Sequence, residues 1–478
     1  MYGIPFIILG NLAGNSIAIG STIMSTTTDM KDSKGAILGI AVAVLTAAVA
    51  VHICSRRGGI VINNIFAVGK VLLLLTLIIL GFAIKPTYHN PNYADTVQEN
   101  LHAPQSFWGF GRAVNRSAVD YAKGFSYVLY SYSGFQQPFY VLSEARSPRK
   151  IFPKATITAW AIGTVLFVML NVSFFYVVPK EEVFSLFQTP NSKAAVPSTL
   201  YVFSDYLFGK TNVVARNALA GLAALSIFGN IFVMTFTASR VKQEIAKAGI
   251  LPYSLWLSRS WRTPVEWLKQ KWRPTDSKAA TYQDQSPIPA LLLHWVSSML
   301  MLAFTAKLEP SAAYIALVDI YAYVIRIMVP LVISGGLLYL KFNPKKDWAS
   351  VAQFTSITSP FHIILYFITL AFLAITLFVR PSTDSPAYAI NELSWIIIPA
   401  IGISTLLWGL GWFGGLHLVQ RIRHRTLVVK TNPVVVELEG GEWVQKAVII
   451  EHTWPVRIPG EKHHSETDAN ILSRSTLV

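Results

Sequence analysis

The segment Tyr127-Val-Leu-Tyr-Ser-Tyr-Ser-Gly-Phe-Gln-Gln-Pro-Phe-Tyr140 decides how this chain folds, because it is a hydrophobic helix interrupted by small and polar residues. Ser131, Ser133 and Gly134 are poor formers of an unbroken helix, and Pro138 follows them. In a bilayer each unpaired backbone N–H or C=O costs several kcal/mol, so the interruption must face protein, water or a ligand. It is therefore either half of a binding site or a kink associated with Pro138 that binds nothing.

The composition is that of a helical membrane protein. Of the 478 residues, 53% are hydrophobic and 14% are charged, and the mean hydropathy is +0.45. A soluble globular chain carries closer to a quarter charged residues. Several apolar runs reach the roughly 20 residues that span a bilayer. We therefore expect an all-α polytopic membrane protein with about ten transmembrane helices. The predicted spans are residues 4–24, 35–54, 61–84, 118–142, 155–178, 213–238, 287–305, 313–340, 359–379 and 395–418.

The charges predict orientation and exclude other classes of protein. Lys and Arg (40) outnumber Asp and Glu (25) and lie in alternate connections between apolar runs. This positive-inside pattern places those connections and both termini in the cytoplasm. Because the cations do not form one soluble patch, nucleic-acid binding is not expected. The single cysteine, Cys54, excludes an intramolecular disulfide. We see no catalytic motif, and we expect neither enzymatic activity nor a cofactor.

Two polar segments lie outside the spans. Residues 240–285 contain four tryptophans among many cations, a combination that favours the membrane–water boundary. Part of this connection is therefore either an interfacial amphipathic helix or a solvated loop. From Thr426 onward apolar and polar residues alternate, which predicts a short strand pair, and the last 20 or so residues have the composition of a disordered end.

Ionisable residues inside spans are costly and are functional candidates. Lys70 lies about ten residues into a span whose later part is apolar, so its amine must climb roughly 13 Å to reach the surface. It is either a proton carrier whose charge substitutes for a bound cation or a structural lysine tied to backbone carbonyls. Asp319 and Arg326 lie two turns apart, about 10 Å in rise, so each should have a partner on another helix. Asn230 either joins helices by hydrogen bonds or contacts a ligand, the first role being the commoner.

The interruption has the chemistry to bind a zwitterion. Free N–H groups at the start of a half-helix attract a carboxylate, and free carbonyls accept hydrogen bonds from an ammonium. Aromatic side chains around the break would form apolar walls and a gate. The expected ligand-binding residues are Tyr130, Ser131, Tyr132, Ser133, Gly134, Phe135 and Asn230.

Two long runs resemble a known family. The run Tyr132-Ser-Gly-Phe-Gln-Gln-Pro-Phe-Tyr-Val-Leu-Ser-Glu-Ala-Arg-Ser-Pro-Arg-Lys-Ile-Phe-Pro-Lys154 resembles the sixth helix and following loop of amino acid permeases in the amino acid–polyamine–organocation superfamily. The run Ala238-Ser-Arg-Val-Lys-Gln-Glu-Ile-Ala-Lys-Ala-Gly-Ile-Leu-Pro252 resembles the end of that family's eighth helix. The resemblance is to the fungal L-type or methionine-permease-like branch and extends over residues 1 to about 420.

The resemblance implies a leucine-transporter-like fold with two inverted five-helix repeats. Aligning residues 118–142 with the sixth helix makes the chain N-terminally incomplete, without helices one and two and without the glycine-rich break of helix one. Lys70 then matches a fifth-helix lysine that replaces sodium, and Tyr130 matches an aromatic gate. The implied parts are residues 1–84 (helices 3–5), 85–117 (an extracytoplasmic loop), 118–340 (helices 6–10), 341–418 (two further spans) and 419–478 (a cytoplasmic tail).

The implied function is secondary active transport of an amino acid bound at the unwound helix, either coupled to protons or by exchange. The expected partners are the amino acid, the lipid bilayer, protons as a coupling ion and a single-pass accessory subunit of unknown identity, and the expected location is the plasma membrane. Because two helices of the family pattern are missing, the alternative is a non-transporting amino acid sensor or scaffold, or an inactive truncated permease.

Overall fold

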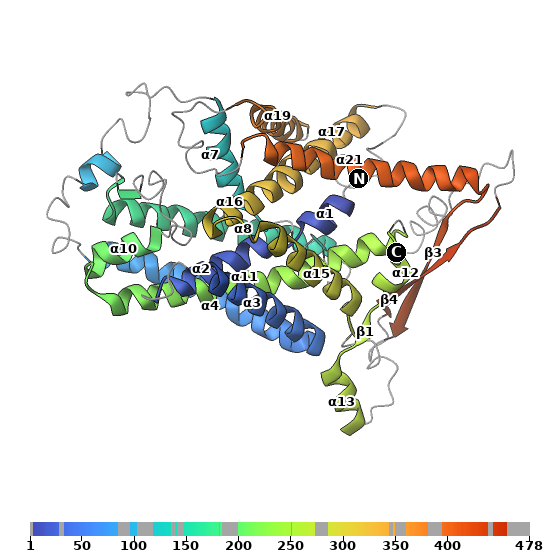
Figure 1. Cartoon of the computed structure of the whole chain (residues 1–478), viewed down its shortest axis with the longest axis horizontal. Helices are drawn as coiled ribbons and strands as arrows, with labels where there is room; N and C mark the ends of the chain where they lie inside the picture. The colour runs from blue at the N-terminus through green and yellow to red at the C-terminus, as the bar shows by residue number, and fades with distance from the viewer. Residues whose placement is uncertain are drawn as a thin grey trace.

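Long helices run side by side along the molecule (Figure 1). In the computed structural model the described residues are 3–27, 33–84, 96–102, 118–134, 137, 139–140, 148–180, 182–183, 199–249, 251–272, 285–343, 348, 360–380, 394–437 and 443–456. Within these ranges eight helices are long and apolar enough to cross a bilayer. The prediction of an all-α polytopic membrane protein is confirmed.

The eight long helices follow the predicted spans closely. They are α1 (Gly3–Leu9) with α2 (Ala13–Met24), α3 (Lys34–Cys54), α4 (Arg56–Ala83), α8 (Pro148–Val177), α11 (Val213–Lys247), α15 (Ile288–Thr305), α16 (Pro310–Tyr321) continuing through the π-helix η4 (Ala322–Met328) into α17 (Val329–Phe342), and α21 (Ile397–Ile422). The shorter elements are η2 (Gln98–His102), α7 (Ala118–Ser131), α10 (Thr199–Phe208), α12 (Ser254–Leu257), α13 (Pro264–Trp272) and α19 (Phe361–Thr376). The predicted spans 118–142 and 359–379 correspond to α7 and α19.

Side chains immediately before three of the long helices fix where those helices begin. Ser33 before α3, Ser55 before α4 and Asn212 before α11 each accept a hydrogen bond from the backbone N–H three residues later, at 3.4, 3.0 and 3.1 Å. Such caps satisfy N–H groups that have no partner inside the helix. The polar residues between apolar runs therefore also set the helix boundaries.

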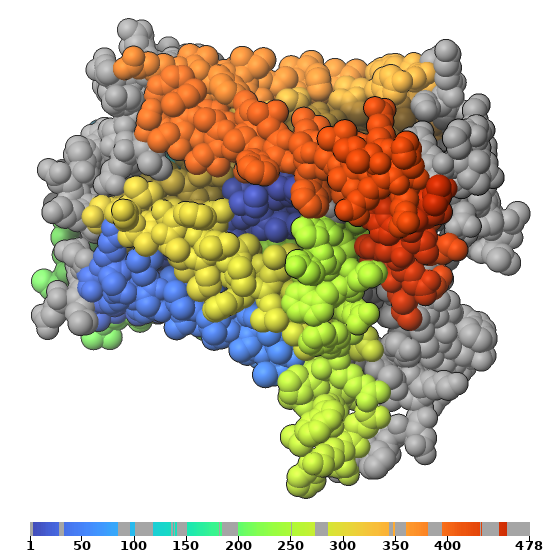
Figure 2. Space-filling view, turned by 45° about the vertical axis from the view of Figure 1, so that its right-hand side comes forward, coloured from blue at the N-terminus to red at the C-terminus, as the bar shows by residue number. Residues whose placement is uncertain are grey.

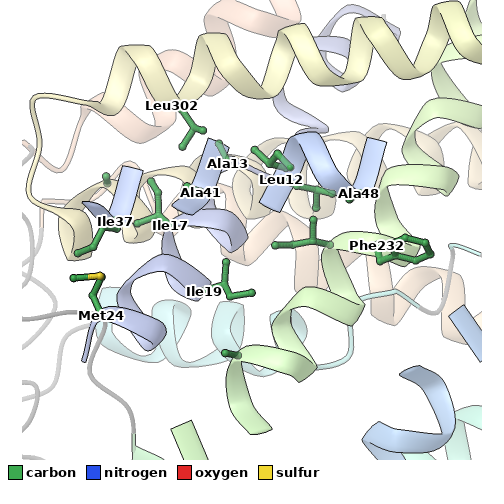
Figure 3. Packing of buried hydrophobic residues seen from close by; sticks show 14 residues of the cluster. Leu12, Ala13, Ile17, Ile19, Met24, Ile37, Ala41, Ala48, Phe232 and Leu302 are labelled. Atoms are coloured by element: carbon green, nitrogen blue, oxygen red, sulfur yellow. The ribbon is translucent and has the colours of Figure 1, made fainter. Parts of the chain in front are cut away.

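The largest apolar core joins α2, α3 and α11 (Figure 3). Ile17 and Phe232 in this cluster are no more than 1% exposed. Gly20 of α2 lies so close to α3 that a Cβ atom there would sit 2.6 Å from the backbone oxygen of Ile37. Small residues at helix contacts allow this approach within a membrane, where dispersion replaces the hydrophobic effect.

Gly20→Ala is therefore expected to destabilise the protein by about 1–3 kcal/mol, because the new methyl group meets backbone that cannot rotate away. The matched control is Gly39→Ala on α3, where a Cβ atom would have no neighbour within 4 Å. The melting temperature of the detergent-solubilised protein, measured by fluorescence-detected gel filtration, should fall only for Gly20→Ala. Equal melting temperatures for the two variants would contradict this close helix contact.

The first predicted span is interrupted, contrary to the expectation of one continuous helix. Residues 4–24 were expected to form one helix, but α1 and α2 are separated by Gly10-Asn11-Leu12. Figure 2 shows α1, dark blue, in the middle of one face, bordered by α21 and by α11. This interruption brings a second set of helix ends into the interior.

Two small sheets lie at one end of the bundle (Figure 1). Strands β1 (Trp261–Arg262) and β2 (Gln285–Ser286) pair antiparallel, as do β3 (Val428–Glu437) and β4 (Trp443–Thr453), with a bulge between Val434 and Val435. The predicted strand pair after Thr426 is confirmed, whereas residues 457–478 lie outside the described part. Helix α13 has no buried residue and extends away from the bundle, so part of the 240–285 connection is helical.

Candidate functional site

Helix α7 ends at the predicted interruption. The helix stops at Ser131, and Gly134 has a positive φ of 108°. The Ser131 hydroxyl donates to the Val128 carbonyl at 2.7 Å and the Ser133 hydroxyl to the Leu129 carbonyl at 3.2 Å. These bonds satisfy part of the carbonyl groups that a helix C-terminus leaves without partners. The described half of the break is therefore a carbonyl end, with negative partial charge.

The interruption between α1 and α2 supplies the opposite polarity. The Asn11 side-chain oxygen accepts from the Ala13 N–H at 3.0 Å, and its side-chain nitrogen donates to the Ile8 carbonyl at 3.1 Å. Asn11 thus hydrogen-bonds on both sides of the break, to the last turn of α1 and to the first N–H of α2. Gly14 and Asn15, in the first turn of α2, line the same cavity as the α7 break. A helix N-terminus carries positive partial charge and exposed N–H donors.

Both interruptions open into one cavity of about 750 Å³. Its wall comes from α1, α2, α3, α4, α7, α11, α16 and η4. No Asp or Glu occurs among the lining residues that the structure describes, whereas Arg56 and Arg326 do. The apolar part of the wall is Leu9, Leu12, Ile60, Val233, Met234, Phe236, Leu317 and Val318. The cavity combines a cationic polar side with an apolar side, as expected for a small zwitterion with an apolar substituent.

Arg326 is a cation that directly contacts the end of α7. It lies in the π-helix η4, a geometry that recurs at functional sites. Its guanidinium carbon lies 4.4 Å from the ring centre of Tyr130 and 5.2 Å from that of Tyr321, and Nη1 donates to the Leu129 carbonyl at 3.4 Å. Within the described residues Nε is buried without a hydrogen-bond partner. Arg326 is thus held by two aromatic rings and keeps donor capacity for an anion.

Arg326 and Asp319 both have partners across the helix contact with α7, as their spacing predicted. Asp319 interacts electrostatically with Lys123 of α7, while Arg326 contacts Leu129 and Tyr130 of the same helix. Asp319 and Lys123 line a separate, smaller cavity of about 50 Å³. The carboxylate of Asp319 therefore lies outside the wall of the main cavity.

Five of the predicted ligand-binding residues line the main cavity of about 750 Å³, namely Tyr130, Ser131, Ser133, Gly134 and Asn230.

Two further predicted residues lie elsewhere, and one is not described. The Tyr132 ring centre lies 6.3 Å from that of Trp160 and 6.1 Å from that of Phe167, both on α8. Phe135 lies outside the described residues. Lys70 of α4 is partly exposed and is not one of the residues that line the cavity.

The part of the site that comes from the first span was not predicted. Asn11, Gly14 and Asn15 were assigned to an ordinary helix, although the spacing of Gly10 and Gly14 around Asn11 was a usable signal for a break. Arg56 was assigned to a cytoplasmic connection because it lies between the predicted spans 35–54 and 61–84, yet it begins α4 and lines the cavity.

Comparison with known proteins gives one family. A profile of the family described as "Amino acid permease" matches residues 2–404. The chain is 24% identical over 444 residues to the high-affinity methionine permease of Saccharomyces cerevisiae, an alignment that covers 90% of this chain and 67% of that protein.

Two other relatives are similar over shorter lengths. The low-affinity methionine permease of the same yeast is 27% identical over 255 residues, which is 53% of this chain and 43% of that protein. The human cystine/glutamate transporter is 24% identical over 219 residues, or 46% of this chain and 35% of that protein. The chain thus spans about two thirds of the first relative's length and less than half of each of the other two.

Proposed function

Because the chain belongs to the amino acid permease family, we propose that it binds an amino acid in the main cavity and carries it across the membrane as a secondary active transporter. The observation that supports this proposal most strongly is the meeting of two helix interruptions of opposite polarity at one cavity. The start of α2 offers N–H donors and the end of α7 offers carbonyl acceptors. An α-amino acid carries the complementary pair of charges on one carbon atom.

In the proposed complex the substrate carboxylate lies between the first turn of α2 and Arg326. Guanidinium–carboxylate hydrogen bonds are charge-assisted and frequently bidentate. The ammonium group lies at the carbonyl end of α7, near Ser131 and Ser133. Tyr130, stacked on Arg326, then covers the ligand as an aromatic gate. Asn230 of α11 completes the polar side of the cavity.

The proposed substrate class is an amino acid with an uncharged, apolar side chain. Val233, Met234 and Phe236 supply an apolar wall on α11, against which a thioether or branched side chain would pack. The two yeast relatives are named as methionine permeases, so methionine is the first compound to test.

Uptake of labelled methionine in cells lacking their own permeases should exceed that of cells carrying the empty vector. No excess uptake of methionine or of any other apolar amino acid would overturn transport by this chain.

We place this integral membrane protein in the plasma membrane with both termini in the cytoplasm. The positive-inside distribution of Lys and Arg supports this orientation. We retain the equivalence of residues 1–84 to helices 3–5 and of 118–340 to helices 6–10, with 85–117 outside the cell and 419–478 in the cytoplasm. An accessory single-pass subunit remains a proposal from the family resemblance alone.

Lys70 is the proposed coupling residue by its match to the fifth-helix lysine of sodium-independent relatives. If its charge replaces a bound cation, Lys70→Met should abolish accumulation of the amino acid against its gradient while leaving exchange of internal for external amino acid. Proteoliposomes loaded with unlabelled methionine separate these two activities. Accumulation at the wild-type level in Lys70→Met would leave Lys70 as a structural lysine.

The second candidate function is an amino acid sensor or scaffold that does not transport. The β3–β4 hairpin favours the sensor, because this folded element packs just beyond the end of α11, a helix that lines the main cavity. A Cβ atom on Gly249, which follows α11, would lie 2.4 Å from the Val429 side chain of β3. Methionine binding without uptake, together with a phenotype on deleting residues 426–478, would support the sensor and exclude the transporter.

A further inference from the structure

A fully buried lysine lies directly behind the α1–α2 interruption. Lys242 of α11 is 0% exposed. Its Nζ lies 3.2 Å from the Gly10 carbonyl oxygen, 3.1 Å from His294 Nδ1 and 2.9 Å from Ser297 Oγ. An ammonium group has three N–H donors, so this arrangement supplies one acceptor for each. The geometry therefore accommodates the charged form of Lys242.

Among the described residues, no carboxylate bonds that ammonium. None of the ion pairs between described residues includes Lys242, and its three contacts are a carbonyl, an imidazole and a hydroxyl. Burial of an ammonium without a counter-charge is unfavourable even when it is hydrogen-bonded. Release of a proton removes this cost, so both protonation states are physically accessible at this position.

His294 gives the site a second place for the proton. Its side chain is 0% exposed, and within the described residues Nε2 is buried without a hydrogen-bond partner. While Nδ1 accepts from the Lys242 ammonium, the neutral ring must carry its hydrogen on Nε2. If Lys242 passes a proton to Nδ1 and the Nε2 proton leaves to water, the amine lone pair accepts from Nδ1–H. One proton leaves and every contact is kept, while Nε2 changes from an unpaired donor to an unpaired acceptor.

Among the titratable side chains on α11 and on the helices packed against it, His294 is the one that contacts Lys242. Helices α1, α2 and α12, which pack against α11, contain no Asp, Glu, Lys, Arg or His. His52 of α3 acts electrostatically on His294. On α11 itself, Arg240 bonds Gln243 and Glu244 bonds Lys247. The other helices packed against α11 carry the charged residues Lys34 on α3, Arg56, Arg57 and Lys70 on α4, and Asp205 on α10. Asp205 pairs with Arg216 of α11.

We propose that Lys242 and His294 form a proton-binding site whose occupancy is linked to the shape of the substrate cavity. The link is Gly10, which accepts the Lys242 hydrogen bond and is flanked by Leu9 and Asn11 of the cavity wall. A charge-assisted hydrogen bond is roughly twice as strong as a neutral one. Loss of the proton therefore loosens the interruption at the cavity. This inference deepens the proposed transport function and rests on it for its role in coupling.

The transport test uses the full chain in proteoliposomes and labelled methionine. A proton gradient, acidic outside, should drive accumulation in the wild type. Lys242→Met and His294→Gln should each lower that accumulation about tenfold or more, within the usual range of coupling between two sites, while exchange at equal pH persists. Ser297→Ala removes an acceptor of Lys242. Its control is Thr305→Ala at the end of the same helix, where the hydroxyl donates to the Met301 carbonyl at 2.9 Å. Only Ser297→Ala should reduce proton-driven accumulation.

A labelling test does not depend on transport. In a Cys54→Ser background, the thiol-reagent reaction rate of Asn15→Cys at the cavity is divided at each pH by that of Lys269→Cys on exposed α13. The pH dependence of this ratio is compared between chains that carry the same two thiols, so ionisation of the thiols contributes equally to each. The ratio should change less with pH after His294→Gln, or after Lys242→Met where that variant folds, than in the otherwise native chain. A labelling ratio that changes with pH in this way, in a chain that does not transport, would support the proton site and contradict the proposed function. An unchanged pH dependence in the variants would overturn the proton site.

Discussion

Arg326→Met is expected to raise the KM for the transported amino acid roughly 10- to 150-fold. Hydrogen bonds to a charged group are worth about 1.5–3 kcal/mol, and each 1.4 kcal/mol corresponds to about a factor of ten. Methionine replaces the long side chain with an apolar one of comparable reach, so part of the packing against Tyr130 and Tyr321 is kept while the charge is lost. Initial rates of labelled uptake at several concentrations measure the effect.

The matched control for this variant is Arg216→Met. Arg216 bonds Asp205 at 2.6 Å and does not line the cavity, so its removal should leave the KM unchanged. Arg326→Lys keeps the charge but not the planar fork, and we expect an intermediate KM. A KM for Arg326→Met equal to that of the native chain would remove Arg326 from carboxylate binding. Gel filtration of each variant checks that the protein remains folded.

Gly134→Ala is the second variant for which we expect a large effect. Gly134 has φ of 108°, a conformation that costs an L-residue about 1–3 kcal/mol. The interrupted form of the α7 segment should therefore be depopulated about 5- to 150-fold relative to other conformations. We expect a matching loss in the rate of amino acid exchange, measured in proteoliposomes with the same amount of reconstituted protein.

Gly124→Ala provides the comparison on the same helix. Gly124 lies within α7, and a Cβ atom there would have no neighbour within 4 Å. Alanine favours a helix interior over glycine, so this variant should exchange amino acid at the native rate and be as stable or slightly more stable. If both variants exchange at the same rate, the positive φ of Gly134 is not needed for function.

The end of α7 could be predicted from the sequence because its causes are local. Ser131, Ser133 and Gly134 disfavour an unbroken helix through their own backbone and hydroxyl chemistry, and the helix ends at Ser131. The bounds of α3 and α4 follow from capping serines in the same way. Features of this kind depend on residues only a few positions apart, so the printed sequence contains them.

The other half of the site depends on contacts between distant segments. The average apolarity of residues 4–24 hides the break at Gly10, which is held by the hydrogen bond from the Ala13 N–H to Asn11 and by Lys242 on α11. Helix α11 also continues beyond its predicted end to Lys247, because apolarity marks the membrane-embedded part and not the polar extension. Burial of Lys242 requires α1 and α15 to pack over it, which no local pattern reveals.

The most direct test asks whether an amino acid occupies the cavity between the two helix interruptions. In a Cys54→Ser background, Ser133→Cys places one thiol in the cavity wall, and Lys269→Cys places one on exposed α13 as a control. The reaction rate of each thiol with a water-soluble reagent is measured with and without methionine. Methionine should slow modification at residue 133 and leave the rate at residue 269 unchanged. Equal rates at residue 133 with and without every amino acid tested would contradict a substrate site at this cavity.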